Sequence, residues 1–130
     1  MRLVRFLLAT ALVLAALPAA SHADTPHKTF VYFVVPRPGL LEHSTEAEQK
    51  ATGAHFVRLK QALKDGSLIL AGPTDPPTIG IVIFTATDLA AAKAWAEADP
   101  AVEAGAFTLK SVEPFELALE RAGPGIGLAK

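Results

Sequence analysis

The amino-acid sequence predicts one α+β domain, in which a four-stranded antiparallel sheet carries two helices on one of its faces. Two segments, 30–35 and 78–85, are dense in β-branched and aromatic residues and apolar on both faces, which is typical of buried strands. Each precedes a stretch in which apolar residues recur at helical spacing behind a residue suited to capping. Two further strand patterns complete the order β-α-β-β-α-β.

The first strand and the first helix have clear ends in the sequence. Prolines directly after 30–35 end the strand, because proline donates no hydrogen bond to a sheet. Thr45 and Glu48 have the spacing of a capping box, and apolar residues follow at helical period until Gly66, a natural stop. We therefore expect a strand over 30–35 and a helix over 46–64.

The second half of the domain continues with a hairpin, a helix and a last strand. A proline-rich turn joins the two strands of the hairpin, and Asp99 before a proline fits the cap of a short helical turn. The expected elements are a strand over 67–71, a strand over 78–85, a helix from Thr87 or Asp88 to Ala98, one turn capped by Asp99, a strand over 107–112 and an extended edge over 115–119.

This element order is that of the split β-α-β, ferredoxin-like arrangement, and it has a consequence for assembly. Two helices can cover only one face of a four-stranded sheet, whereas the strands at 30–35 and 78–85 are apolar on both faces. The second face therefore needs another cover. A second copy of the same sheet is the simplest one, so we expect a homodimer.

The first 23 residues have the layout of a secretory signal peptide. Arg2 and Arg5 give a positively charged start, 6–17 is an almost unbroken apolar run, and small residues lead to Ala23. The run has about a dozen residues, whereas a membrane span needs roughly 20. We expect cleavage after Ala23, and a periplasmic or secreted protein that makes no membrane contact afterwards.

Composition limits what the remaining chain can do. We assign 24–120 to the folded domain and the Gly- and Pro-rich 121–130 to a flexible tail. Residues 1–23 hold two of the 12 basic groups and none of the 13 acidic groups, so the rest has a net charge of −3. Its basic residues form no run, which argues against nucleic acid as a partner. The lack of cysteine excludes disulfides and a thiolate nucleophile.

Four separated motifs resemble the YCII-related (YciI-like) family, over roughly 30–119. They are His55-Phe56-Val57-Arg58-Leu59, Leu68-Ile69-Leu70-Ala71-Gly72-Pro73, Ala94-Trp95-Ala96 with Asp99-Pro100-Ala101-Val102 and Ala104-Gly105, and Val112-Glu113-Pro114-Phe115. The resemblance implies a ferredoxin-like fold that pairs as a dimeric α+β barrel. The family is similar to muconolactone isomerases and to enzymes that remove chloride from chlorinated hydroquinones.

The resemblance also implies a catalytic pair, a histidine and an aspartate that line a pocket. Matched motif by motif, these residues are His55 and Asp99. The chain departs from the family pattern at Thr52, where many members have an arginine, and near Ala101 and Phe107, where they have tyrosines. Each departure removes a hydrogen-bond donor.

Both candidates also have a structural interpretation. His55 lies about 40° round the helix from Ala51, close to its apolar stripe, so it is either a core histidine or an inward-facing base. Asp99 is suited to capping the helical turn that follows it. Capping and catalysis are compatible, since an aspartate held by its own backbone is a rigid partner for an imidazole.

Other polar and aromatic residues give weaker indications. Some fit either the core or the walls of a ligand pocket. These are Tyr32, Gly72, Pro73, Trp95 and Phe107. The histidines at 27, 43 and 55 lack the spacing of metal ligands, so we expect no metal and no cofactor.

Two functions remain open from the sequence. The first is a small-molecule isomerase or lyase in which His55 transfers a proton and Asp99 orients it. The second is a non-catalytic dimer that binds a small apolar ligand or acts as an accessory module. A catalyst requires the two side chains within hydrogen-bond distance, whereas a binding protein requires only an apolar cavity.

Overall fold

A computed structural model describes residues 27–119 of the chain. The predicted signal peptide at 1–23 and the predicted tail at 121–130 lie outside the described residues. The elements are β1 (Lys28–Pro36), α1 (Glu46–Asp65), β2 (Leu68–Pro73), β3 (Gly80–Ala86), α2 (Leu89–Glu97), α3 (Pro100–Glu103) and β4 (Phe107–Pro114).

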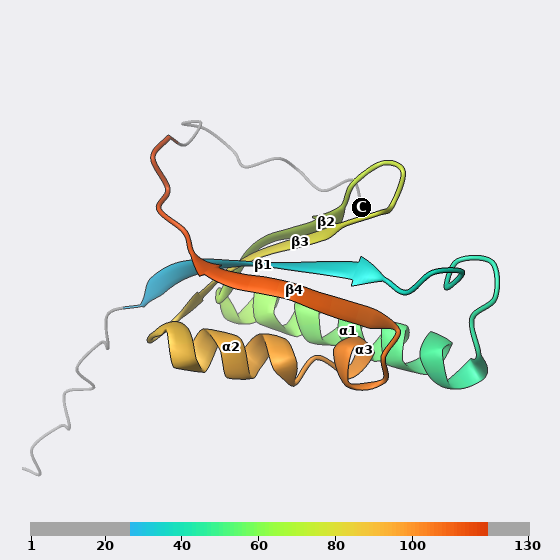
Figure 1. Cartoon of the computed structure of the whole chain (residues 1–130). Coiled ribbons are helices and arrows are strands. Elements are labelled where there is room, and N and C mark those ends of the chain that lie inside the picture. Colours follow the sequence, from blue (N-terminus) through green and yellow to red (C-terminus); the bar gives the residue numbers. More distant parts are fainter. Residues whose placement is uncertain (1–26, 120–130) are drawn as a thin grey trace, which may run out of the picture.

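The four strands form one antiparallel sheet in the order β2-β3-β1-β4. The three helices lie together on one face of this sheet, with α2 and α3 beside α1 (Figure 1). The predicted ferredoxin-like α+β class is therefore confirmed. The pairing of two such sheets in a barrel stays a prediction.

Capping interactions set the limits of α1. The hydroxyl of Thr45 accepts a hydrogen bond from the backbone N–H of Glu48 at 3.2 Å, and the Glu48 carboxylate accepts one from the Thr45 N–H at 2.8 Å. Gly66 ends the helix in the left-handed region at φ 81° and donates its N–H to helix carbonyls. The predicted capping box and stop are thus both present.

Most predicted boundaries differ from the structure by one or two residues, including the strand predicted over 107–112, which continues to Pro114. Two differences have a clear physical reason. The strand expected to end at residue 71 continues through Gly72 and Pro73, because β2 is an edge strand and an edge tolerates proline. The extended edge predicted over 115–119 was wrong. Phe115 donates one backbone hydrogen bond to Thr29 at 2.9 Å, but β1 begins at Lys28 and offers β4 little to pair with beyond that point.

Side-chain alternation along β1 divides the sheet into two different faces. Phe30, Tyr32 and Val34 are buried in one cluster with apolar residues of α1 and α2, so they point toward the helices. The residues between them, such as Phe33, point to the opposite face, where Phe33 stays partly exposed.

No helix in the range 27–119 is long and apolar enough to cross a membrane.

Candidate active site

The fold brings His55 and Asp99 into direct contact, although they are 44 residues apart in the sequence. His55 lies in the middle of α1, and Asp99 is the residue that caps α3. Nδ1 of His55 is 2.6 Å from Oδ2 of Asp99. The two side chains are buried, with His55 5% exposed and Asp99 not exposed at all. They meet where α1 packs against α3, beneath the surface of the helix layer.

The two oxygens of Asp99 have separate partners. Oδ1 accepts a hydrogen bond from the backbone N–H of Ala101 at 2.9 Å, which caps α3 as the sequence predicts. Oδ2 faces His55, the hydroxyl of Tyr32 at 3.5 Å and Nη1 of Arg58 at 3.7 Å. Because Oδ1 is held by the backbone N–H of Ala101, the carboxylate is fixed with Oδ2 directed at the imidazole of His55.

The charge on Asp99 is maintained by its partners. Burial raises the pKa of the Asp99 carboxyl, but the hydrogen bond and charge of His55, the Ala101 N–H and the Arg58 charge together hold that pKa below its ordinary value. A carboxylate only accepts hydrogen bonds, so Nδ1 of His55 must be the donor. Nε2 makes no hydrogen bond to any residue in the described range, so its lone pair has no protein donor there.

Tyr32 supports this pair from the sheet. It is fully buried in the core, and its hydroxyl donates to Oδ2 of Asp99. Burial, followed by the negative charge of Asp99, raises the pKa of the Tyr32 phenol well above its ordinary value. The structure therefore places Tyr32 behind Asp99, and not on the wall of an open pocket.

Aromatic rings flank the imidazole on two sides. The Phe107 ring meets the His55 ring edge-on at a centroid distance of 5.2 Å, and the Phe56 ring does so at the same distance. Phe107 is thus beside the pair, and its place in a pocket wall stays a prediction. The sequence did not identify Phe56 as a neighbour of His55. Phe56 is half exposed, so this aromatic neighbour lies toward solvent.

Arg58 is the main residue of the site that sequence reasoning missed. It lies one turn after His55 on α1, and its guanidinium stacks 4.3 Å over the ring of Trp95 on α2. Nη2 donates a hydrogen bond to the Trp95 carbonyl oxygen at 2.6 Å. The three-residue spacing from His55 places both side chains on one helix face, which is the signal that could have identified Arg58.

Gly72 and Pro73 are not brought to the pair. Both are exposed on the edge strand β2, and neither shares a hydrogen bond with His55 or Asp99. Trp95 is partly buried and contacts Arg58, one helical turn from Asp99.

Within residues 27–119, no group of three or more His, Cys, Asp or Glu side chains is placed to hold a metal ion.

Comparisons with known proteins agree in pointing to one family. The profile of the YCII-related domain matches residues 29–116. Proteins named "Protein YciI" from Escherichia coli O6:H1 and Shigella flexneri are each 39% identical over 83 residues, covering 56% of this chain and 85% of the relative. A protein of Haemophilus influenzae described as uncharacterized is 34% identical over 97 residues, covering 67% of this chain and 95% of the relative.

Proposed function

The chain belongs to the YCII-related domain family, and from its buried His55–Asp99 pair we propose that it is an enzyme that moves a proton on a small molecule. The observation that carries the proposal is the 2.6 Å contact between Nδ1 of His55 and a carboxylate that stays ionised in a buried site. Such a contact fixes the tautomer of the ring and stabilises its protonated form, the two properties that a general base needs.

In the proposed reaction, Nε2 of His55 is the base. It forms a bond to a proton as the C–H bond next to a substrate carbonyl breaks, and the electron pair passes into that carbonyl. The imidazolium is stabilised by the negative charge of Asp99, which itself stays unprotonated. The imidazolium then returns the proton to a second carbon in an isomerisation, or a leaving group departs in an elimination.

The surroundings of the pair suit this chemistry. His55 is nearly free of water contact, so the charge of Asp99 acts on it with little screening. The rings of Phe56 and Phe107 form an apolar surface beside the imidazole, which fits a cyclic or lactone-like substrate. The family's similarity to muconolactone isomerases supports the same substrate class.

Incorporation of solvent deuterium into muconolactone tests the proposal. Wild-type protein should catalyse the exchange. His55→Gln and Asp99→Asn should each slow it by at least ~100-fold, because the first removes the base and the second favours the wrong tautomer. Lys60→Gln, an exposed change on the same helix, is the matched control and should leave the rate unchanged. Equal exchange in wild type and His55→Gln would reject His55 as the base.

The near-complete burial of the pair favours a second candidate function. His55 is only 5% exposed, which leaves a substrate little room to reach the imidazole, whereas a protein that binds an apolar ligand has no such requirement. In this case His55 and Asp99 join α1 to α3 as a structural link. Ligand binding without any deuterium exchange across a panel of lactones would support this candidate over the enzyme.

A homodimer is part of the proposal, because the sheet face opposite the helices is rich in apolar side chains. On that face the residues are Val31, Phe33, Val35, Ile81 and Ile83. Light scattering of the purified protein should report a dimer, and Phe33→Lys should shift it to a monomer. Leu89→Lys on the helix side is the control. A wild-type protein that is monomeric at micromolar concentration would contradict the dimer.

Export is the remaining part of the proposal. The charged start, apolar run and small residues of 1–23 favour a cleaved signal peptide and a periplasmic or secreted site of action. The intact mass of protein from the periplasmic or secreted fraction of the native host should correspond to a chain that begins at Asp24. A mass that includes Met1 in that fraction would contradict cleavage.

A further inference from the structure

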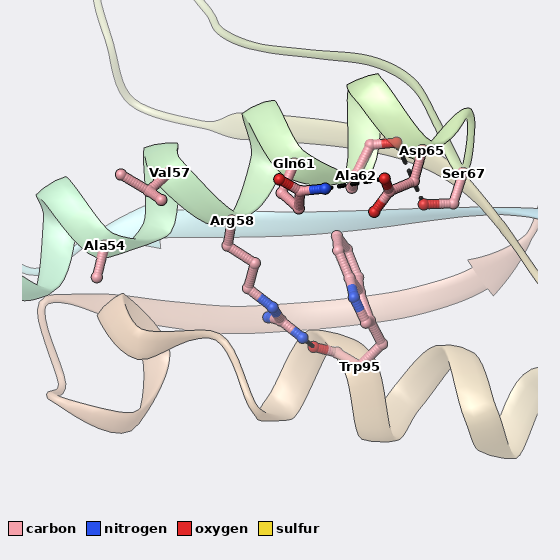
Figure 2. A pocket seen from close by; sticks show the side chains of 8 residues that line it. All are labelled: Ala54, Val57, Arg58, Gln61, Ala62, Asp65, Ser67 and Trp95. Atoms are coloured by element: carbon pink, nitrogen blue, oxygen red, sulfur yellow. Dashed lines mark hydrogen bonds between the residues drawn. The ribbon is translucent and has the colours of Figure 1, made fainter.

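A groove of about 550 Å³ lies between α1 and Ser67, the residue before β2, on one side and α2 on the other, one helical turn from the His55–Asp99 pair. Figure 2 shows Arg58 and Trp95 reaching toward each other across the gap between the two helices. The lining residues are Ala54, Val57, Arg58, Gln61, Ala62, Asp65, Ser67 and Trp95. The volume is within the range of roughly 300–1,000 Å³ that is typical of small-molecule sites.

The guanidinium of Arg58, which lines this groove, has an unused hydrogen-bond donor. Nη1 is buried and has no hydrogen-bond partner among the described residues, and the Asp99 oxygen nearest to it is 3.7 Å away. Nη2 has a single partner, the backbone oxygen of Trp95. A buried charged donor without a partner is unfavourable, and a ligand that accepts its hydrogen bond removes the cost.

We propose that this groove binds small organic carboxylates and that Arg58 is the residue that holds the carboxylate group. A planar guanidinium matches a carboxylate in shape and charge, and forms paired hydrogen bonds with it. Arg58 is the only cationic residue of the lining, which suits a single negative charge better than a phosphate. Its side chain is 23% exposed, so a ligand in the groove can contact it, and the proposal requires the buried Nη1 to turn toward the bound carboxylate.

The charges of the lining orient the ligand. Asp65 is the only acidic residue there, and it lies at the far end of α1 with its Oδ1 accepting a hydrogen bond from Gln61 at 2.8 Å. A carboxylate is therefore attracted at the Arg58 end and repelled at the Asp65 end. Ala62 and Trp95 lie between these two ends, and Ala54 and Val57 lie beyond Arg58 (Figure 2). These apolar lining residues favour a ligand with an apolar body, as in an aromatic or alicyclic acid.

Trp95 provides a direct readout, because it is the only tryptophan of the chain and forms a wall of the groove. Benzoate binding should change its fluorescence in a saturable way. Benzamide has the same shape without the charge and should bind at least ~10-fold more weakly. The titration requires no turnover, so its outcome is independent of the deuterium-exchange assay for the proposed reaction.

Three variants locate the site. Arg58→Met keeps the length of the side chain and should weaken benzoate binding by at least ~10-fold, whereas Lys60→Met, on the exposed side of the same helix, should not. Ala54→Phe leaves the charge of Arg58 in place and should block binding by filling the groove.

Two results would overturn the proposal, and neither needs the Arg58 variant to fold. One is an equal response of wild-type protein to benzoate and benzamide. The other is the absence of any saturable response to benzoate in the wild type.

Discussion

Helix α1 contributes to two clusters that each join an arginine to a carboxylate, and the two clusters are built differently. At its start, Arg37 donates two hydrogen bonds to the carboxylate of Glu48 and others to the carbonyl oxygens of Pro38 and His43. In its middle, Arg58 stands 3.7 Å from Asp99 and leaves a buried donor without a partner among the described residues. The first pair is partly exposed, with Arg37 at 31% and Glu48 at 12%, whereas His55 and Asp99 in the second cluster are largely buried.

The cluster of Arg37 and Glu48 acts as a structural clamp, whereas the cluster of Arg58 and Asp99 belongs to the candidate active site. Hydrogen bonds from Arg37 and from Thr45 lower the pKa of Glu48 to about 2, so this carboxylate is fully used in tying the loop after β1 to the helix. At Asp99, burial opposes ionisation and only the partners maintain the charge. Keeping a buried carboxylate ionised in this way costs folding free energy, and such carboxylates are typical of functional sites.

The largest expected effect is that of Asp99→Ala. It removes the cap of α3 and leaves the buried His55 and the partly buried Arg58 without their counter-charge, so the free energy of unfolding should fall by about 3–5 kcal/mol. Urea denaturation measures this loss. Asp99→Asn keeps a capping oxygen and should lose less. If Asp99→Ala lowered the free energy of unfolding no more than Glu48→Gln does, the two clusters would not differ in their contribution to stability.

A smaller effect is expected for Tyr32→Phe, which keeps the ring and removes the hydroxyl that donates to Asp99. The loss should be about 0.5–1.5 kcal/mol, the usual net contribution of one hydrogen bond. Urea denaturation again gives the value, and Phe84→Leu in the same core is a control for packing alone. An unchanged stability would show that the 3.5 Å contact contributes nothing.

Alkaline pH tests the same residue without a mutation. The pKa of Tyr32 is raised in the folded state, so folding favours the neutral phenol. This contribution is present below the unfolded pKa of about 10 and is lost as the pH rises above it. Tyr32 is the only tyrosine of the chain, so phenolate absorbance follows it directly. It should appear together with the loss of circular dichroism, and phenolate in the folded protein near pH 10 would contradict the burial argument.

The smallest effect is expected at the loop clamp. Glu48→Gln should lower the melting temperature less than either change above, because solvent-accessible ion pairs contribute little and are screened by salt. The pKa of Glu48 is lowered on folding, so its contribution is present above the ordinary value of 4.5 and is lost as the pH falls toward 2. A carboxyl NMR titration checks this. A midpoint near 4.5 would show that Arg37 does not hold Glu48.

Local patterns in the sequence predicted most of the fold. The capping box at Thr45, the stop at Gly66 and the cap at Asp99 are all present, because each depends on residues within a few positions of one another. The wrong extension over 115–119 depended on where the partner strand begins, which is a distant feature of the chain.

The candidate site was less predictable for the same reason. Resemblance to a family nominated His55 and Asp99, but their distance is set by the packing of α1 against α3. The burial of Tyr32 behind Asp99 depends on the register of β1 in the sheet. Arg58 was overlooked because a lysine or arginine on a helix is usually read as a solvated side chain, and its contact with Trp95 is a tertiary one.

The central claim is that Asp99 holds the proton of His55 on Nδ1 and leaves Nε2 free to act as a base. Nitrogen-15 NMR of the His55 ring measures this directly, because the two nitrogens differ in chemical shift according to which one carries the proton. We predict the Nδ1–H tautomer of the neutral ring in wild type and a switch to Nε2–H in Asp99→Asn, whose amide can donate to Nδ1. An Nε2–H tautomer in wild type, or the same tautomer in both proteins, would contradict the account.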